Sequence, residues 1–407
     1  MTIKYSSNNT IILDDYSVKL LVQATLNTST VNGHTHNFYR YPARFSPIFV
    51  RQIISQFSKP GDLIIDPFVG GGTTIVEARA LGRRAVGVDI NSLATFISKA
   101  KTTLFTKKDT SEISKWFNQL PNNMNLHKHV DINIEWLNYF RNIDCKKTWP
   151  LRNSIQLAIN QIIKLQTNKQ QTFARCALLK TAQWALDSQK KLPTASEFRS
   201  KYLLDAEIMI AAISNYSANV RKADKGWDAN GLHRVKVLNR STVGIDTDQR
   251  LFNIHKPRLI LTSPPYPGVH VLYHRWQVNG RRETSAPYWI ANKLDGSGAS
   301  YYTFGDRKAE NLADYYTNTY KTFKSLANLS GKRTLLVQMI AFSKPSWQLP
   351  LYLDTLSDAG FKEYKVKDIA NRKDGRLWRK VPNRKWHANL KGKLSSSKEV
   401  VLFHKLK

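Results

Sequence analysis

Two short segments of the chain combine residue types that could act on a bound nucleotide. The first, residues 66–74, has the sequence DPFVGGGTT and places an acid and three glycines directly after an apolar run. Glycines at such a turn let the backbone approach a ligand closely, at the end of the sheet where α/β proteins bind ligands. A dinucleotide fingerprint starting at Gly70 would need glycine at position 75, which is Ile75, and no P-loop Gly-Lys-Ser/Thr follows. The segment therefore predicts a ligand part that is not a phosphate.

A second acid follows the next apolar run, residues 85–88, as Asp89. A carboxylate at the end of this strand can accept two hydrogen bonds from a ribose diol, which selects a nucleoside without a ribose phosphate. Asp66, at the end of the preceding run, would add a favourable charge for a positively charged group such as a sulfonium. These residues predict a cationic nucleoside ligand.

The second segment, residues 262–266, has the sequence TSPPY and again follows an apolar run. Two successive prolines fix an extended backbone and remove two N–H donors, so the neighbouring carbonyls are held in fixed directions. Ser263 adds another acceptor, and Tyr266 offers a flat face on which a displaced base could stack. The segment is therefore suited to holding an amine on a planar ring.

The elements that position these segments alternate between short apolar runs and amphipathic stretches. Continuous apolar runs bounded by turn residues predict buried parallel strands, and amphipathic spacing ended by glycine predicts helices. The expected strands are 63–65, 85–88, 235–238, 259–261, 334–339, 361–366 and 400–404; the expected helices outside the central block are 48–57, 74–81, 311–329 and 349–357. This order predicts an α/β fold with a mostly parallel, doubly wound sheet that ends in an antiparallel hairpin.

Four regions follow from this pattern. We expect a peripheral N-terminal arm over 1–35 and the first part of the α/β domain, with the glycine turn, over 36–102. Residues 103–232 contain helical patterns without strands and predict a helical insertion, with helices at 154–165, 173–186 and 205–216. The second part of the α/β domain, with the Pro-Pro-Tyr turn, covers 233–407.

The charge of the chain predicts a polyanionic partner. Its 407 residues include 62 Lys and Arg against 30 Asp and Glu, a net charge of +32, while 42% are hydrophobic. A disordered basic tail would lack those apolar residues, so the charge must belong to a folded surface. Lys and Arg bind nucleic acid by neutralising phosphates and releasing counterions. Two segments rich in basic and aromatic residues, 270–308 and 371–398, are the candidate binding loops.

Several function classes are disfavoured. No apolar run reaches the roughly 18 residues of a spanning helix, and the first residues lack a signal sequence, so we expect a cytoplasmic protein and no membrane partner. Cys145 and Cys176 have no further ligand at metal-binding spacing, which predicts buried thiols and no metal site. The same surroundings disfavour a thiol nucleophile, and with it methylation of a cytosine ring carbon.

At these motifs the sequence resembles a known family, the amino-group DNA methyltransferases that use S-adenosylmethionine. Residues 66–74 are similar to the family's cofactor motif D-P-F-x-G-x-G-T-T, and residues 87–91 (GVDIN) to its next acidic strand end. Residues 262–266 look like the catalytic motif [DNS]-P-P-[YFW] in its Ser-Pro-Pro-Tyr form, and residues 41–47 (YPARFSP) resemble a cofactor-flanking motif. The helical block 103–232 has no counterpart in this resemblance.

The resemblance implies a Rossmann-like methyltransferase fold with S-adenosylmethionine as cofactor. The implied cofactor-binding residues are Phe45, Asp66, Pro67, Phe68, Gly70, Gly72, Thr73, Thr74, Asp89, Ile90 and Thr262; the implied catalytic residues are Ser263, Pro264, Pro265 and Tyr266; the candidate DNA-binding residues are Arg275, Arg281, Arg282, Arg372, Arg376, Arg379, Lys380, Arg384 and Lys385. In this family the Ser-Pro-Pro-Tyr form is associated mainly with the exocyclic amine of cytosine, and the Asp or Asn forms with adenine.

A chemical argument supports this assignment. The lone pair of an exocyclic amine is delocalised into the ring until hydrogen bonds hold the amine hydrogens. We expect Ser263 Oγ and the Pro264 carbonyl to accept those hydrogens, so that positioning supplies most of the rate. Ser263 is a very poor base, so the proton would leave after methyl transfer, to solvent or to a group that the sequence does not identify.

The expected function is a bacterial or phage-type enzyme that methylates cytosine N4 in double-stranded DNA by base flipping, in the cytoplasm at the nucleoid. It would be the modification half of a restriction–modification pair, with a separately encoded endonuclease as a further partner. Three alternatives stay open: methylation of the adenine amine in DNA, methylation of an RNA base, and a catalytically idle DNA-binding subunit.

Overall fold

The computed structural model describes residues 4–41, 44–130, 134–224, 234–251, 254–267, 275–278, 280, 282–296, 302, 304–305, 312–380 and 398–407. Its strands are β1 (Lys4–Tyr5), β2 (Thr10–Ile12), β3 (Leu63–Asp66), β4 (Arg84–Asp89), β5 (Val235–Asn239), β6 (Leu259–Thr262), β7 (Trp276–Val278), β8 (Arg282–Thr284), β9 (Leu335–Ala341), β10 (Phe361–Val366), β11 (Leu377–Lys380) and β12 (Lys398–Leu406). Its α-helices are α1 (Asp15–Leu26), α2 (Pro47–Phe57), α3 (Thr73–Ala80), α4 (Ser92–Thr102), α5 (Lys107–Asn123), α6 (Trp149–Ile162), α7 (Asn168–Leu186), α8 (Ala195–Asp224), α9 (Ala286–Ala291), α10 (Ala313–Leu329) and α11 (Pro345–Asp358).

The large sheet has the predicted α/β architecture. Its strands lie in the order β1-β2-β10-β12-β9-β6-β3-β4-β5, and β11 pairs with β12. The five strands β5, β4, β3, β6 and β9 are parallel, whereas β12 runs antiparallel to both β9 and β10. The terminal antiparallel pair of β10 and β12 is therefore confirmed, and β12 lies between β10 and β9 in the sheet. This Rossmann-like sheet brings the carboxyl ends of β3, β4 and β6 to one edge.

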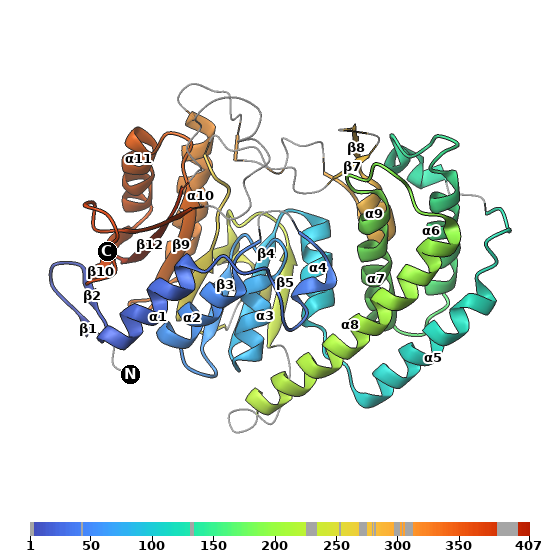
Figure 1. Cartoon of the computed structure of the whole chain (residues 1–407). Coiled ribbons are helices and arrows are strands. Elements are labelled where there is room, and N and C mark those ends of the chain that lie inside the picture. The colour runs from blue at the N-terminus through green and yellow to red at the C-terminus, as the bar shows by residue number, and fades with distance from the viewer. Residues whose placement is uncertain are drawn as a thin grey trace.

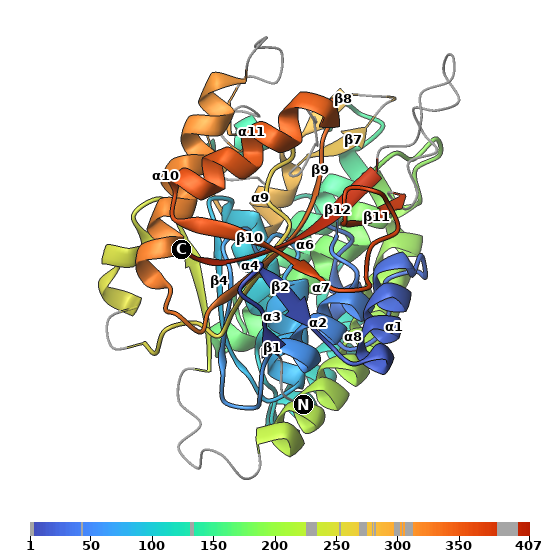
Figure 2. The ribbon, with the colours of Figure 1, turned by 90° about the vertical axis from the view of Figure 1, so that its left-hand side faces the viewer.

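Helices cover both faces of the sheet, which explains why its strands are continuous apolar runs. Leu63 and Ile65 of β3 pack in the layer that includes Phe323 of α10, whereas Ile64 packs on the opposite face with Phe49 of α2. The strand is buried along its whole length. Figure 2 shows α10 and α11 on one side of the sheet and α1, α2 and α3 on the other. The doubly wound arrangement predicted from the element order is thus confirmed.

The N-terminal arm is part of the sheet rather than peripheral. β2 pairs in parallel with β10, where Ile11 lies opposite Val366, and Ile11 is fully buried. α1 begins after Asp14, whose side chain accepts a hydrogen bond from the Ser17 N–H at 2.8 Å, a typical N-cap. α1 packs on α2 through Leu21. This region is polar and its strands are only two and three residues long, so no hydrophobic period predicts them.

The helical block lies beside the β5 edge of the sheet and is continuous with it (Figure 1). The predicted helices correspond to α6, α7 and α8, which begin 5, 5 and 10 residues before their predicted starts at 154, 173 and 205. The core of the block includes Phe173 of α7 and Tyr202 of α8, together with Phe96 and Ile97 of α4. The helix that follows β4 therefore shares one apolar core with the block.

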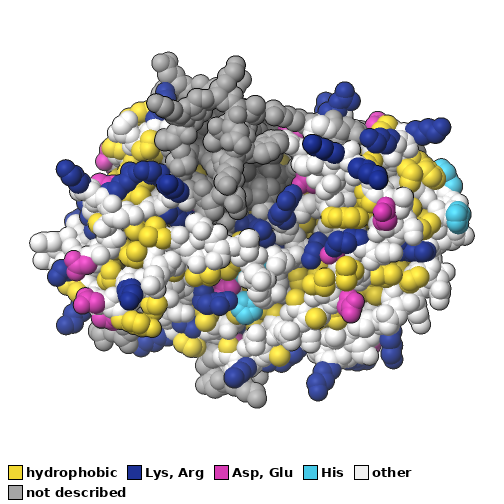
Figure 3. Space-filling view, in the orientation of Figure 1, with side chains coloured by type: hydrophobic (Ala, Val, Ile, Leu, Met, Phe, Trp, Pro, Cys, Tyr) yellow, Lys and Arg dark blue, Asp and Glu magenta, His cyan; other side chains and the backbone are white. Residues whose placement is uncertain are grey.

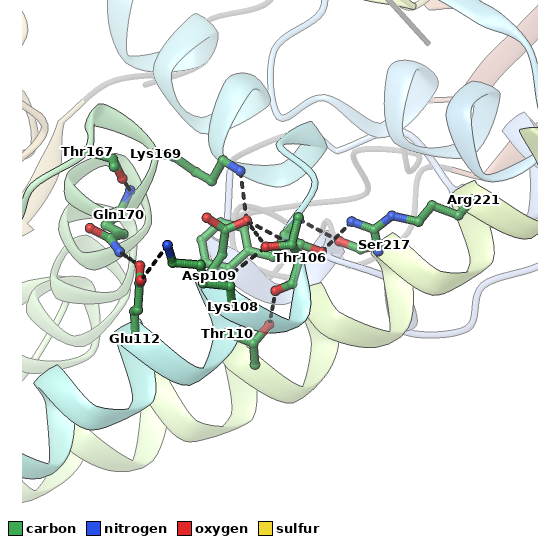
Figure 4. A network of polar contacts seen from close by, with 11 residues as sticks. Thr106, Lys108, Asp109, Thr110, Glu112, Thr167, Lys169, Gln170, Ser217 and Arg221 are labelled. Atoms are coloured by element: carbon green, nitrogen blue, oxygen red, sulfur yellow. Dashed lines mark hydrogen bonds and ion pairs between the residues drawn. The ribbon is translucent and has the colours of Figure 1, made fainter. Parts of the chain in front are cut away.

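A polar network fixes the start of α5 against α7 and α8 (Figure 4). Thr106 and Asp109 form a capping box at the start of α5, and Lys169 Nζ of α7 donates to Asp109 Oδ2 at 2.9 Å. The backbone N–H of Phe105 donates to Ser217 Oγ of α8 at 2.9 Å. These bonds satisfy the free N–H groups of the helix start and hold three helices together.

Candidate active site

The glycine turn between β3 and α3 is held in place by side chains that bond its carbonyl oxygens. Thr242 Oγ1 donates to the Pro67 carbonyl at 2.7 Å, and Ser98 Oγ donates to the Gly70 carbonyl at 3.0 Å. Lys101 Nζ, which is buried, donates to the Gly71 carbonyl at 2.7 Å. Burial lowers the pKa of Lys101 to about 7. With the turn carbonyls engaged on this side, the turn is preorganised for a ligand on the other side.

Glycine is required in this turn by conformation and by space. Gly72 has φ +82°, and a Cβ at this position would lie 2.8 Å from Ser98 Oγ. Gly70 has φ +45°, and a Cβ there would lie 3.2 Å from the ring of Tyr41. The backbone therefore passes where no side chain fits, as the sequence motif predicts.

Asp89 lies at the carboxyl end of β4, and its carboxylate is anchored by backbone donors. The Gly70 N–H donates to Asp89 Oδ2 at 2.9 Å, and the Asn91 N–H donates to Asp89 Oδ1 at 2.9 Å. Burial raises the pKa of Asp89 to about 6. Each carboxylate oxygen retains acceptor capacity, so both can still accept a hydrogen bond from a diol.

Asp66 lies at the end of β3 and is nearly fully buried. Its Oδ1 accepts hydrogen bonds from the Phe68 N–H at 3.1 Å and from Thr262 Oγ1 at 2.7 Å. Burial raises the pKa of Asp66 to about 6. Thr262, predicted to contact the cofactor, is fully buried behind the pocket and holds Asp66 instead.

The Pro-Pro-Tyr turn follows β6 and is tied to the sheet by hydrogen bonds. Ser263 Oγ lies 3.0 Å from the Tyr266 hydroxyl, which donates to Glu399 Oε1 of β12 at 2.7 Å. The Tyr315 hydroxyl of α10 donates to the Pro265 carbonyl at 2.8 Å. The two motif residues with polar side chains are thus in mutual contact.

Both motifs line one pocket at this edge of the sheet. The predicted residues on its wall are Phe45, Asp66, Pro67, Phe68, Gly70, Thr73, Asp89, Ile90, Ser263, Pro265 and Tyr266. Four others do not line it: Gly72, Thr74, Thr262 and Pro264. Thr74 and Pro264 are buried, and Gly72 begins α3. The structure therefore brings the predicted cofactor turn and the predicted catalytic turn together in one pocket.

The pocket wall also includes residues that sequence reasoning did not name as site residues. They are Tyr41, Arg44, Val69, Gly71, Arg240, Ser241, Thr242, Tyr302, Phe304 and Thr322. Arg44 lies in the YPARFSP motif, so a signal for it existed; burial lowers its pKa. Arg240 follows β5 and is ion-paired with Asp248 at 2.6 Å. No comparable motif marks the β5 end, so Arg240 could not be found from the sequence.

The first basic segment is largely structural in its described part. Trp276 and Trp289, which were candidates for contact with a base, are 2% exposed and belong to the core of the helical block, in β7 and α9. Arg275 is ion-paired with Asp295 at 2.7 Å. Arg282 is exposed, and Arg281 lies outside the described residues. The prediction of an aromatic binding loop is wrong for these two tryptophans because their apolar area is buried against α7.

The second basic segment includes β11, which the sequence did not predict. Arg376 is ion-paired with Glu363 at 2.7 Å, and Arg379 is buried and ion-paired with Glu399 at 2.7 Å. These two guanidiniums, predicted to bind DNA, are thus paired with carboxylates of neighbouring strands. Arg372 and Lys380 are exposed. Arg384 and Lys385 lie outside the described residues.

Basic side chains are spread over the face drawn in Figure 3, on the sheet side and on the helical block, with few acidic side chains among them.

Within the described residues, no group of His, Cys, Asp and Glu is arranged to hold a metal ion. None of the described helices combines the length and the apolar character needed to cross a membrane. Cys176 is buried, whereas Cys145 is exposed, which corrects its prediction as a buried thiol.

The sheet and the pocket at its edge define the fold class, which is α/β and Rossmann-like. Comparison with known proteins agrees, because a DNA methylase family is matched over residues 19–100. The type II methyltransferase M.MjaII of Methanocaldococcus jannaschii is 33% identical over 20% of this chain and 15% of its own length. M.MvaI of Kocuria varians is 43% identical over 19% of this chain and 18% of its own. The DNA adenine methyltransferase YhdJ of Escherichia coli is 30% identical over 19% of this chain and 30% of its own length.

Over this segment the chain is therefore similar to the DNA methylase family. The matches span less than a fifth of the lengths of M.MjaII and M.MvaI. The family match ends at residue 100, before the Pro-Pro-Tyr turn. The family implies S-adenosylmethionine as methyl donor. The residues present fit it, because the glycine turn, Asp89 and Arg44 line one pocket, Asp89 has acceptor capacity for a diol, and the Arg44 guanidinium suits a carboxylate.

Proposed function

We propose that the protein transfers a methyl group to the exocyclic amine of a base in double-stranded DNA, and that the base is cytosine, methylated at N4. The observation that carries the proposal is that the glycine turn with Asp89 and the turn with Ser263 and Tyr266 line one pocket. The net charge of +32 suits a polyanionic substrate. The Ser in the Ser-Pro-Pro-Tyr motif supports cytosine over adenine.

The residues of the pocket support a mechanism based on positioning. Asp89 and the backbone of the glycine turn would hold the nucleoside part of S-adenosylmethionine, which supplies a methyl group on a positively charged sulfur. Arg44 would bind its carboxylate. Ser263 Oγ would accept one amine hydrogen and the Pro264 carbonyl the other, which frees the nitrogen lone pair for attack. Fixing both partners in one pocket can account for several orders of magnitude in rate.

The amine of a paired base is not accessible inside the duplex, so the proposal includes base flipping. The ring of Tyr266 is the candidate stacking surface for the flipped base, worth about 1 to 3 kcal/mol. Of the nine basic residues predicted to bind DNA, Arg282, Arg372 and Lys380 are described and exposed, and we retain these for contacts to phosphate. The names of the relatives support a role as the modification enzyme of a restriction–modification pair.

One experiment tests both the activity and the base. The protein is incubated with S-adenosylmethionine carrying a tritiated methyl group and with unmethylated DNA of mixed sequence, and the DNA is digested to nucleosides. Label in N4-methylcytosine supports the full proposal. Label only in N6-methyladenine keeps a DNA amino-methyltransferase and overturns the cytosine assignment. Label only with RNA, or no label despite DNA binding, overturns the proposed activity.

Ser263→Ala tests the catalytic assignment in the same assay. Removal of the hydroxyl should slow methyl transfer by about 10²-fold while cofactor binding stays unchanged, because Ser263 acts on the amine. Calorimetric titration with S-adenosylmethionine provides the binding control. A Ser263→Ala protein as fast as the parent would show that the amine is held elsewhere.

A further inference from the structure

Four side chains behind the catalytic turn form a continuous hydrogen-bonded chain. Ser263 Oγ lies 3.0 Å from the Tyr266 hydroxyl, the hydroxyl donates to Glu399 Oε1 at 2.7 Å, and Arg379 Nε donates to Glu399 Oε2 at 2.7 Å. Glu399 and Arg379 lie opposite each other on β12 and β11 and are 6% and 7% exposed. A nearly buried ion pair thus connects directly to the side chain proposed to hold the substrate amine.

The chemistry of these groups fixes the direction of the chain. The carboxylate of the Glu399–Arg379 ion pair has no hydrogen and can only accept. Tyr266 has one hydroxyl hydrogen and donates it to Glu399. The contact between Ser263 and Tyr266 must then have Ser263 as donor. With its own hydrogen directed at Tyr266, Ser263 Oγ presents only lone pairs to the pocket, as an acceptor for an amine N–H must.

We propose that Glu399 is a positioning residue for methyl transfer: through Tyr266 it holds Ser263 as a hydrogen-bond acceptor, and it takes up the proton that the methylated amine releases. This inference rests on the proposed function, and it identifies the proton acceptor that the sequence does not reveal. Arg379 belongs to this relay rather than to the DNA surface, since both of its described hydrogen bonds are internal, to Glu399 and to the Thr25 carbonyl.

The step balances in atoms and charge. The amine nitrogen forms the new N–C bond as the donor's C–S bond breaks, and the electron pair of that bond stays on sulfur. The nitrogen then carries the positive charge and loses one hydrogen as a proton to Ser263 Oγ. Ser263 passes its own hydrogen to Tyr266, and Tyr266 passes its hydrogen to Glu399. The products are a neutral methylated base and a neutral Glu399 carboxylic acid, which returns its proton to solvent.

Glu399→Gln should reverse the polarity of the chain without removing its atoms. Glutamine has one acceptor oxygen, and the positively charged Arg379 is the stronger competitor for it. The amide NH₂ then faces Tyr266 and donates to the hydroxyl, so Tyr266 donates to Ser263. Ser263 must direct its hydrogen into the pocket, against the amine. We expect single-turnover methyl transfer to fall by about 10²-fold, with DNA and cofactor dissociation constants within about twofold of the parent.

A matched control is available on the neighbouring strand. Glu363 of β10 pairs with Arg376 through two hydrogen bonds of 2.7 and 2.8 Å, so it is also a partly buried Glu–Arg pair. The structure gives it no contact with Tyr266 or Ser263 among the described residues. Glu363→Gln should therefore leave the single-turnover rate unchanged. An equal loss in both variants would mean that any broken Glu–Arg pair in this sheet impairs the enzyme, and would overturn the relay.

Two further measurements separate a relay from a general structural effect. In a Ser263→Ala background, Glu399→Gln should change the residual rate by less than about twofold, because Glu399 acts through Ser263; additive losses would contradict this. In the protein without cofactor or DNA, ¹³Cζ-labelled tyrosine gives an NMR signal for Tyr266, assigned with Tyr266→Phe. That signal should move in Glu399→Gln and stay in place in Glu363→Gln; an unmoved signal in Glu399→Gln overturns the hydrogen bond itself.

Tyr266→Phe keeps the test valid if Glu399→Gln fails to fold, because it breaks the chain and leaves the Glu399–Arg379 pair intact. It should slow single-turnover transfer by about tenfold while the fluorescence of a flipped 2-aminopurine stays unchanged, since the ring is retained. A parental rate in Tyr266→Phe overturns the relay. The proposed function fails separately: it is overturned when Ser263→Ala is fully active, whereas the relay alone is overturned when Ser263→Ala is impaired and Glu399→Gln is not.

Discussion

Replacement of Asp89 by asparagine should weaken cofactor binding by an amount that the structure sets. The Asp89 carboxylate accepts the Gly70 and Asn91 N–H groups, one on each oxygen. Asparagine has a single oxygen, so one backbone N–H must face an NH₂ group, at a cost of about 1 to 3 kcal/mol. The charged acceptor for a ribose hydroxyl is also lost, at about 1.5 to 3 kcal/mol. The backbone cost is present with and without the cofactor and lowers stability, so only the lost charged acceptor lowers the affinity, by about 10- to 10²-fold.

The assay is calorimetric titration of the protein with S-adenosylmethionine. Asp62→Asn is the matched control, because Asp62 precedes the same sheet's β3 at the opposite end and accepts the Lys59 N–H. That variant should bind the cofactor like the parent. Asp89→Asn with parental affinity, in a protein that circular dichroism shows to be folded, would refute the placement of the ribose at Asp89.

The same residue gives the binding a pH dependence. Burial raises the pKa of Asp89 to about 6, so the folded protein takes up a proton here at a higher pH than an exposed Asp would. Below about pH 6 the carboxylate becomes a neutral acid and a poorer acceptor, and cofactor affinity should fall as the pH is lowered. Asp89→Asn should lose most of this dependence; the remainder reports Asp66, whose pKa burial also raises to about 6. An equally steep fall in Asp89→Asn would contradict the assignment.

Three further predictions concern the turn and the helical block. Gly72→Ala should destabilise the fold by at least about 1 to 2 kcal/mol in urea unfolding, because alanine is strained at φ +82° and its Cβ would meet Ser98 Oγ. Lys101→Met should flatten the pH dependence of stability, measured as the unfolding free energy at pH 7 and 9. Burial lowers the Lys101 pKa from 10.5 to about 7, so between these pH values the unfolded chain binds the proton and the folded chain does not. The parent therefore gains stability as the pH rises, and the variant should not. Trp289→Ala should cost about 3 to 5 kcal/mol of unfolding free energy, since Trp289 is a core residue at 2% exposure. A cost below about 1 kcal/mol would contradict its place in the core.

The sheet was predictable because its strands are buried on both faces. The continuous apolar runs that became β3, β4, β6 and β9 need no partner information to be recognised, and the acids and glycines that follow them mark their carboxyl ends. The observed order also follows from the alternation of strands with helices. In contrast, β2 and β11 are three and four residues long, their extended form depends on β10 and β12, and no local pattern encodes a distant partner.

The site was predictable to the extent that chemistry is carried by short motifs. Asp89, Gly70, Ser263 and Tyr266 line the pocket as their positions after strands predict. Predictions that rested on local composition alone were wrong where side chains are buried by distant elements. The arginines near the two tryptophans and the basic residues near Arg379 predict a DNA-binding surface. Tertiary contacts, which composition does not reveal, bury all three side chains instead. The same reason hid Glu399, an acid far along the chain from the turn that it contacts.

The shared core of the helical block has a consequence for biosynthesis. The layer that joins α4 to α7 and α8 also contains Trp276, Tyr288 and Trp289, which follow the end of α7 by about 90 residues or more. At a translation rate of about 5 to 20 residues per second, these side chains leave the ribosome about 5 to 20 seconds after α7. The helical block therefore exposes apolar surface until a segment that follows β6 has been synthesised. The core of the helical block is completed only after the catalytic turn has also been synthesised, so the helical block and the active site form at the same stage.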